Sequence, residues 1–174
     1  GMINAAWLGE NADPTTSMSN LVSTLKANHI TYAIIMVGYW DATNPAAPKL
    51  AIHNGHALSY WDSVCATLKS NGITPIAWIE GGVSWGESKG TPDIRQANYA
   101  AYQSVIASVV SHGFSGYSDD IESWAGQSVK DKIAYLNALT PFLHGLGKLN
   151  MPAVPSNTGG GGDYNQHLHV DYIL

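Results

Sequence analysis

The chain has 174 residues and a formal net charge of −5, and only 12% of its residues are charged. A chain of this length can bury a sizeable hydrophobic core, and it is most economically folded as one domain over residues 1–174. The 8 Lys and Arg residues are scattered without a basic run, which argues against nucleic acid or an anionic membrane surface as a partner. No apolar run approaches the roughly 18 residues that a membrane-spanning helix needs.

Cys65 is the single cysteine of the chain, which excludes an internal disulfide framework and a thiolate metal cluster. Gly1 precedes Met2, as in chains from which a purification tag has been removed. The lack of a visible signal peptide therefore leaves the compartment open, an extracellular one included.

Buried strands and amphipathic helices are predicted to alternate along the chain. Ser17 is the predicted N-cap of the first helix, and residues 31–37 are almost continuously apolar, as in a parallel strand covered on both faces. The loop over 42–55 is too long for a plain connector and is predicted to form part of a binding rim. Pro141 is predicted to kink or divide the last helix. The predicted strands are 4–9, 31–37, 73–80, 113–124, 149–154 and 168–174, and the predicted helices are 18–28, 58–71, 92–112 and 128–146.

This alternation favours βαβ units and a parallel sheet. The turn over 9–14 lacks the glycine-rich fingerprint of a dinucleotide site, and no P-loop is present, so no cofactor is predicted. Polar and aromatic residues instead gather where predicted strands end, as the active face of a (β/α) TIM-type barrel requires; they are Trp7, Glu10, Tyr39, Trp40, Asp41, Trp78, Glu80 and residues 119–124.

A complete barrel has eight strands in about 250 residues, whereas this chain offers about six. We therefore expect an incomplete barrel. The chain would be a truncated or reduced barrel, or another copy or a missing chain segment would complete the wall.

Three carboxylates lie at the end of the fourth predicted strand. Successive side chains of a strand point to opposite faces, so Asp120 and Glu122 would share one face and Asp119 would point to the other. Two acids about 7 Å apart on one face resist ionising together, which raises the pKa of one of them and creates a proton donor near neutral pH. The pattern is that of a general acid site. The alternative is a set of solvated acids that cap the following helix.

The segment Ser115-Gly116-Tyr117-Ser118-Asp119-Asp120-Ile121-Glu122 resembles the fourth-strand signature Asp-Gly-x-Asp-x-Asp-x-Glu of the chitinase-type glycoside hydrolases of family 18. The last two acidic positions are kept, and the first two are serine. The resemblance implies a retaining glycoside hydrolase that acts on a polysaccharide or an amino-sugar glycan. Glu122 would protonate the glycosidic oxygen, and Asp120 would orient the acetamido group that attacks the anomeric carbon. Tyr172 resembles the tyrosine of the family's sixth-strand segment.

A carbohydrate substrate would be bound by aromatic side chains that stack on sugar rings and by a neighbouring carboxylate. The predicted substrate-binding residues are Trp7, Tyr39, Trp40, Trp78, Glu80, Trp124 and Tyr172.

Two other functions remain open. In one, a catalytically silent barrel binds carbohydrate, since Ser115 and Ser118 stand where the family has acids. In the other, a barrel enzyme uses its carboxylates to hold a divalent metal; those carboxylates are Asp119, Asp120, Glu122 and Glu80.

Overall fold

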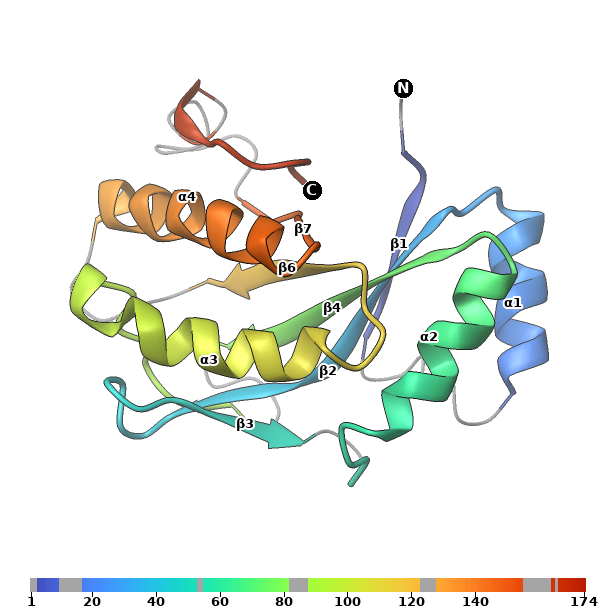
Figure 1. The fold of residues 1–174 in the computed structure, drawn as a ribbon, viewed down its shortest axis with the longest axis horizontal. Helices are drawn as coiled ribbons and strands as arrows, with labels where there is room; N and C mark the ends of the chain where they lie inside the picture. The colour runs from blue at the N-terminus through green and yellow to red at the C-terminus, as the bar shows by residue number, and fades with distance from the viewer. Residues whose placement is uncertain are drawn as a thin grey trace.

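A computed structural model describes residues 3–9, 17–52, 55–81, 88–122, 128–154, 164 and 166–174. Strands and helices alternate along it (Figure 1). The strands are β1 (Ala5–Leu8), β2 (Tyr32–Ala42), β3 (Lys49–Ile52), β4 (Thr74–Gly81), β5 (Lys89–Gly90), β6 (Gly116–Ile121) and β7 (Leu149–Asn150). The helices are α1 (Met18–Ala27), α2 (Tyr60–Ser70), α3 (Tyr99–Val110) and α4 (Val129–Gly145), and a 3₁₀ turn over Gln96–Asn98 leads into α3.

The main sheet is parallel and follows the order β1-β2-β4-β6-β7, while β3 pairs antiparallel with β2 and β5 pairs with β2 over two residues. Along the chain, one helix thus separates each strand of this order from the next: α1, α2, α3 and α4 in turn. Side chains from α1 to α4 all join one core on one face of this sheet. A doubly wound sheet has helices on both faces, so this arrangement is the wall of a (β/α) barrel. The predicted fold, an incomplete barrel, is confirmed.

The helix-facing side of the sheet carries the large core. Leu68 of α2, Ile106 of α3 and Leu139 of α4 are fully buried there, as the helical spacing of apolar residues requires. The opposite, inner face carries a small cluster of three buried side chains, Ile34, Ile76 and Met151, with partly buried residues around it. Apolar burial therefore holds the helices to the outside of the wall and leaves the inner face for other uses.

Helix starts follow the predicted capping chemistry. The Ser17 hydroxyl accepts the backbone N–H of Asn20 at the start of α1. At α4, Ser128 and Asp131 form a capping box in which each side chain accepts the other's backbone N–H. Pro141 lies inside α4, which continues to Gly145 undivided. None of the helices in the described residues is long and apolar enough to cross a bilayer.

The inner and outer positions of β2 change places at a β-bulge between Met36 and Gly38. Before the bulge, Ile34 faces the inner cluster and Ile35 faces the helices. After it, Tyr39 pairs with Glu80, and Trp40 enters the helix-side core. The extra residue of a bulge shifts the alternation of a strand by one position.

Three predicted elements are present in the structure with different bounds or content. The loop over 42–55 contains β3, and the helix expected from residue 92 begins at Tyr99. The fifth strand is assigned over only two residues, although the amides of Met151 and Ala153 still donate to the carbonyls of Tyr117 and Asp119 in β6.

The sixth predicted strand, 168–174, is wrong, because this segment is not a strand. Side chains of α4 satisfy its backbone instead: Asn137 bonds the carbonyl of His167 and the amide of His169, and Thr140 bonds the carbonyl of His169. Only the end of the segment follows a neighbouring strand, where Asp171 donates its backbone N–H to the carbonyl of Asn150.

Candidate functional site

The end of β6 separates its three acids between the two faces of the sheet. Asp119 is fully buried and forms an ion pair with Lys132 of α4. Asp120 is partly buried and lines a pocket, and Glu122, the residue after Ile121, is exposed. The backbone N–H of Glu122 donates to the carbonyl of Gly81 at 3.2 Å, so the register with β4 continues past the end of the strand. The alternation that the sequence predicts for these acids is present.

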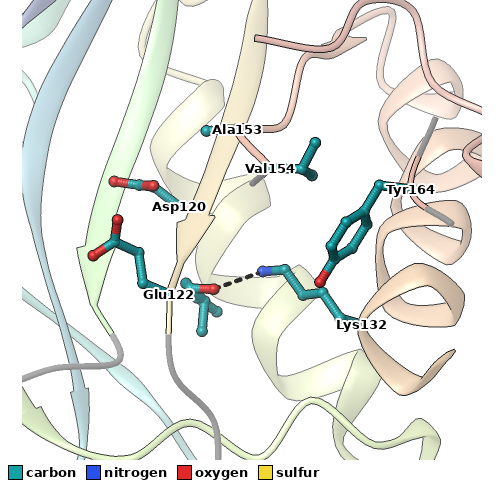
Figure 2. A pocket seen from close by; sticks show the side chains of 7 residues that line it. Asp120, Glu122, Lys132, Ala153, Val154 and Tyr164 are labelled. Carbon is teal, nitrogen blue, oxygen red and sulfur yellow. Dashed lines mark hydrogen bonds between the residues drawn. The ribbon is translucent and has the colours of Figure 1, made fainter. Parts of the chain in front are cut away.

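A pocket of about 400 Å³ opens at the carboxyl end of β6 (Figure 2). In this view the Asp120 and Glu122 carboxyl groups lie close together on one side of the strand, and Lys132 and Tyr164 lie on the other. The pocket thus combines two acids, a buried lysine and an apolar wall. Its lining residues are Asp120, Ile121, Glu122, Lys132, Ala153, Val154 and Tyr164.

Burial, together with the charges around it, raises the pKa of Asp120 to about 7. Loss of hydration is the largest cause, and the negative charges of Glu122, Asp119 and Glu80 follow in that order. The ammonium group of Lys132 acts in the opposite direction and lowers the pKa of Asp120. Asp120 can therefore carry a proton near neutral pH, directly beside a second carboxyl group that faces solvent.

Tyr39, Glu80 and Asp120 lie in one row across three neighbouring strands, because Tyr39 pairs with Glu80 and Glu80 pairs with Asp120. Adjacent strands of a sheet are about 4.8 Å apart, so residues in such a row are direct neighbours on the inner face. Tyr39 is buried and Glu80 is partly exposed. The row places the phenol of Tyr39 and a third carboxyl group, that of Glu80, alongside Asp120.

Trp78 occupies the row below, in register with Met36 and Ser118. Its ring contacts the ring of Trp7 edge-to-face at 4.8 Å, and 40% of Trp7 is exposed. These two indoles give the inner face an aromatic surface that a ligand can reach.

Two predicted substrate-binding residues, Trp40 and Tyr172, are not at this site. Trp40 is fully buried on the helix side, with its ring 5.1 Å from that of Tyr102, because the bulge in β2 turns it outward. Tyr172 lies 6.1 Å from Tyr32, the first residue of β2, and so sits at the opposite end of the strands from Asp120. Trp124 falls outside the described residues, as does Glu10.

The four carboxylates of the predicted metal site are divided between the two faces of the sheet. Asp119 forms an ion pair with Lys132. Asp120 and Glu122 lie on the other side of the strand from Lys132 (Figure 2). Among the described residues, His, Cys, Asp and Glu side chains form no group of three or more that could hold a metal ion.

Sequence reasoning missed Lys132 and Tyr164. Lys132 had a detectable signal, since it continues the buried stripe of Leu136, Leu139 and Leu143 on α4. A lysine on an apolar stripe needs a buried acid as its partner. Asp119 is the acid of β6 that the alternation places on the side away from Asp120 and Glu122. Tyr164 is buried, and its pKa is raised by burial and by the charge of Asp119. It follows a glycine-rich segment without periodicity, so nothing in the sequence indicates this burial.

Solved structures with a similar fold include chitinases. The C-terminal domain of a putative chitinase from Desulfitobacterium hafniense DCB-2 is 15% identical, with a TM-score of 0.67 over 98% of this chain and 53% of that one. A group IV chitinase from Ostrinia furnacalis, in complex with allosamidin, is 14% identical, with a TM-score of 0.69 over 99% of this chain and 50% of its own. The chain spans about half the length of the solved chitinases that it matches.

The same fold also occurs in a D-psicose 3-epimerase, which is 12% identical with a TM-score of 0.55, over 99% of this chain and 62% of that one. The likeness therefore shows the fold, and the reaction has to be argued from the site. No protein-family model matches the chain, and no curated protein does.

Proposed function

We propose that the chain belongs to a glycoside hydrolase that cleaves an amino-sugar glycan, with Glu122 as the general acid and Asp120 as the assisting carboxyl group. The observation that carries the proposal is the pairing of these two acids in a pocket at the carboxyl end of β6, with the pKa of Asp120 raised to about 7. This is the end of the sheet at which barrel enzymes carry their active sites.

The roles follow from where each proton has to go. Glu122 is exposed at the pocket, so it can reach the glycosidic oxygen of a bound sugar. It takes over the proton that Asp120 carries near neutral pH and donates it to that oxygen as the glycosidic bond breaks. Asp120 holds the substrate's acetamido group while the acetamido oxygen attacks the anomeric carbon. Glu122, now ionised, then accepts a proton from the water that releases the product.

The rest of the inner face supports a sugar-binding role. Trp7 and Trp78 offer an accessible aromatic surface, and Tyr39 and Glu80 supply polar atoms in the same row as Asp120. We propose these four, with Trp124, as substrate-binding residues. Trp40 and Tyr172 are left out because of where they lie.

Hydrolysis of labelled chito-oligosaccharides tests the proposal. Glu122→Gln should lower turnover by about 100-fold or more, because an amide cannot donate the proton, and unfolding measurements should show an intact fold. Asp62→Asn is the matched control, since Asp62 is an exposed acid on α2 beside His112. Turnover that is equal in Glu122→Gln and in the wild type would sink the role of Glu122.

The second candidate function is carbohydrate binding without turnover. It is favoured by Ser118, a serine at an acidic position of the family signature, whose buried hydroxyl has no hydrogen-bond partner among the residues that the structure describes. A barrel of this kind would bind oligosaccharide equally well with Glu122 or Gln at position 122, and it would release no product. Calorimetric titration of both forms, run beside the turnover assay, separates the two functions.

A further inference from the structure

The buried Asp119–Lys132 pair lies directly behind the two acids of the pocket. Asp119 is fully buried, and the Lys132 side chain is 3% exposed. Burying two charges removes their hydration, and well-packed apolar residues of similar size would often stabilise a core as well or better. Stability alone therefore does not account for an ion pair at this position.

Lys132 is held from several sides. Its ammonium group bonds Asp119 and lies 5.5 Å from the ring centre of Tyr135, one turn further along α4. It also donates a hydrogen bond of 3.0 Å to the carbonyl of Ile121, drawn as the dashed line in Figure 2. Asp119 in turn accepts the backbone N–H of Ile121. Both backbone polar groups of Ile121 are thus bound by this one pair.

Ile121 is the residue that separates Asp120 from Glu122. The distance and angle between the two carboxyl groups depend on the backbone of this residue, since its dihedral angles set the direction of the chain at the end of β6. The neighbouring strand β4 also restrains the chain here, since Ile121 pairs with Gly81 and the Glu122 amide donates to the carbonyl of Gly81. Beyond Glu122 lies a segment outside the described part of the chain.

We propose that Lys132 is a positioning residue: anchored by Asp119, it holds the Ile121 backbone and thereby fixes the separation of the Asp120 and Glu122 carboxyl groups. The inference rests on the proposed function of those two acids. It assigns the third acid of the strand, Asp119, to the support of the pair.

Several charged groups face Asp120, and the test has to separate their direct effect from positioning. They are Glu122 and Asp119 of the same strand, Glu80 of β4 and Lys132 of α4. A change in the Asp120 pKa after loss of Lys132 would not by itself show positioning. Positioning is shown by the change in the Asp120 pKa on Glu122→Gln, measured once with the buried pair present and once without it. The direct effect of the Asp119 and Lys132 charges on the Asp120 pKa is the same before and after Glu122→Gln, so it cancels in this comparison.

The experiment is an NMR titration of the ¹³C-labelled Asp120 carboxyl group. In the wild-type background, Glu122→Gln should lower the pKa of Asp120, since the charge of Glu122 is one cause of its elevation. In the Asp119→Asn/Lys132→Met background, which leaves neither charge unpaired, the same change should lower it at most about half as far. An equal lowering in both backgrounds would overturn the proposal.

Two further variants make the result decisive. Lys130→Met removes an exposed lysine from the same turn of α4, and it should leave the effect of Glu122→Gln as in the wild type. A reduction in Lys130→Met as large as in the double variant would count against positioning. If the double variant does not fold, the titration is repeated in Lys132→Arg, which keeps the charge but moves the donor nitrogens. A reduced effect there supports the proposal, and an unchanged one overturns it.

The titration needs no substrate, so the two proposals fail separately. If the titration shows positioning by Lys132 but the chain hydrolyses no glycan, only the proposed function is contradicted. If the chain is active, Lys132→Arg should lower kcat far more than it changes KM, because the substrate contacts remain and the acid geometry does not.

Discussion

The two faces of the sheet are built for different tasks. The helix-facing side holds one continuous core from α1 to α4, and its buried polar pair, Asp119 and Lys132, is matched charge to charge. The inner side has a small apolar cluster, and beyond it a row in which Tyr39, Glu80 and Asp120 follow one another. Most of the apolar burial that stabilises the fold is thus on the helix-facing side. The inner side can therefore carry acids such as Asp120, even though burying them costs stability. Asp119 and Asp120, neighbours in the chain, mark this division.

The largest effect is expected from the buried pair. Lys132→Met leaves the Asp119 charge buried without its ammonium partner and should lower the free energy of unfolding by about 3–5 kcal/mol. Urea denaturation measures it. Lys130→Met, on the same helix but exposed, should change that free energy by less than about 0.5 kcal/mol. Similar losses for both lysines would mean that the helix face does not depend on the pair.

Truncation in the helix-side core should come next. Ile106→Ala removes three buried carbons where α3 packs on the sheet, and it should lower the free energy of unfolding by about 2–5 kcal/mol. A loss below about 1 kcal/mol would show that this face is not close-packed. Urea denaturation of the variant and the wild type at one pH decides it.

The pH dependence of stability should reveal Asp120. Its pKa is raised from an ordinary value of 3.8 to about 7, so in the pH range between these values the native state keeps a proton that the unfolded chain has lost. The stabilisation is complete below about pH 4, and it is lost as the pH rises through about 7. Asp120→Asn should remove this fall, which is on the order of a few kcal/mol before solvent screening reduces it.

Thermal unfolding at pH 5 and pH 8 measures the effect. Asp41→Asn is the control, because hydrogen bonds from Thr43 lower the pKa of Asp41, and the stability that they contribute is lost only toward acid pH. A pH 5 to pH 8 difference that persists unchanged in Asp120→Asn would contradict the raised pKa.

The smallest effect on folding should come from the aromatic surface of the inner face. Trp7→Ala removes an edge-to-face contact with Trp78 from a site that is 40% exposed, and should cost about 1 kcal/mol in urea denaturation. If the proposed function is right, the same change weakens oligosaccharide binding more than it weakens the fold. A cost as large as that of Ile106→Ala would mean that both faces contribute equally to the core.

Much of the barrel wall could be predicted from the sequence. The continuously apolar run of β2 and the helical spacing of α1, α2 and α4 are local patterns that depend only on which faces are buried. The segment over 168–174 is wrongly predicted to be a strand, because its residues alternate as they do in a strand. In the structure, side chains of Asn137 and Thr140 of α4 bind the backbone at His167 and His169. The local sequence pattern indicates that a segment is ordered. Which groups bind its backbone, a neighbouring strand or helix side chains, depends on the tertiary structure.

The sequence by itself determined that Asp120 and Glu122 share a face of β6 and that Asp119 does not, since this follows from the alternation of any regular strand. The tertiary structure decided which neighbours those acids have. Lys132 reaches Asp119 only because α4 folds back over β6. Tyr39 rather than Trp40 stands beside Glu80 only because a bulge shifts β2 by one residue. A bulge and a helix crossing depend on long-range pairing, which leaves no periodic trace in the chain.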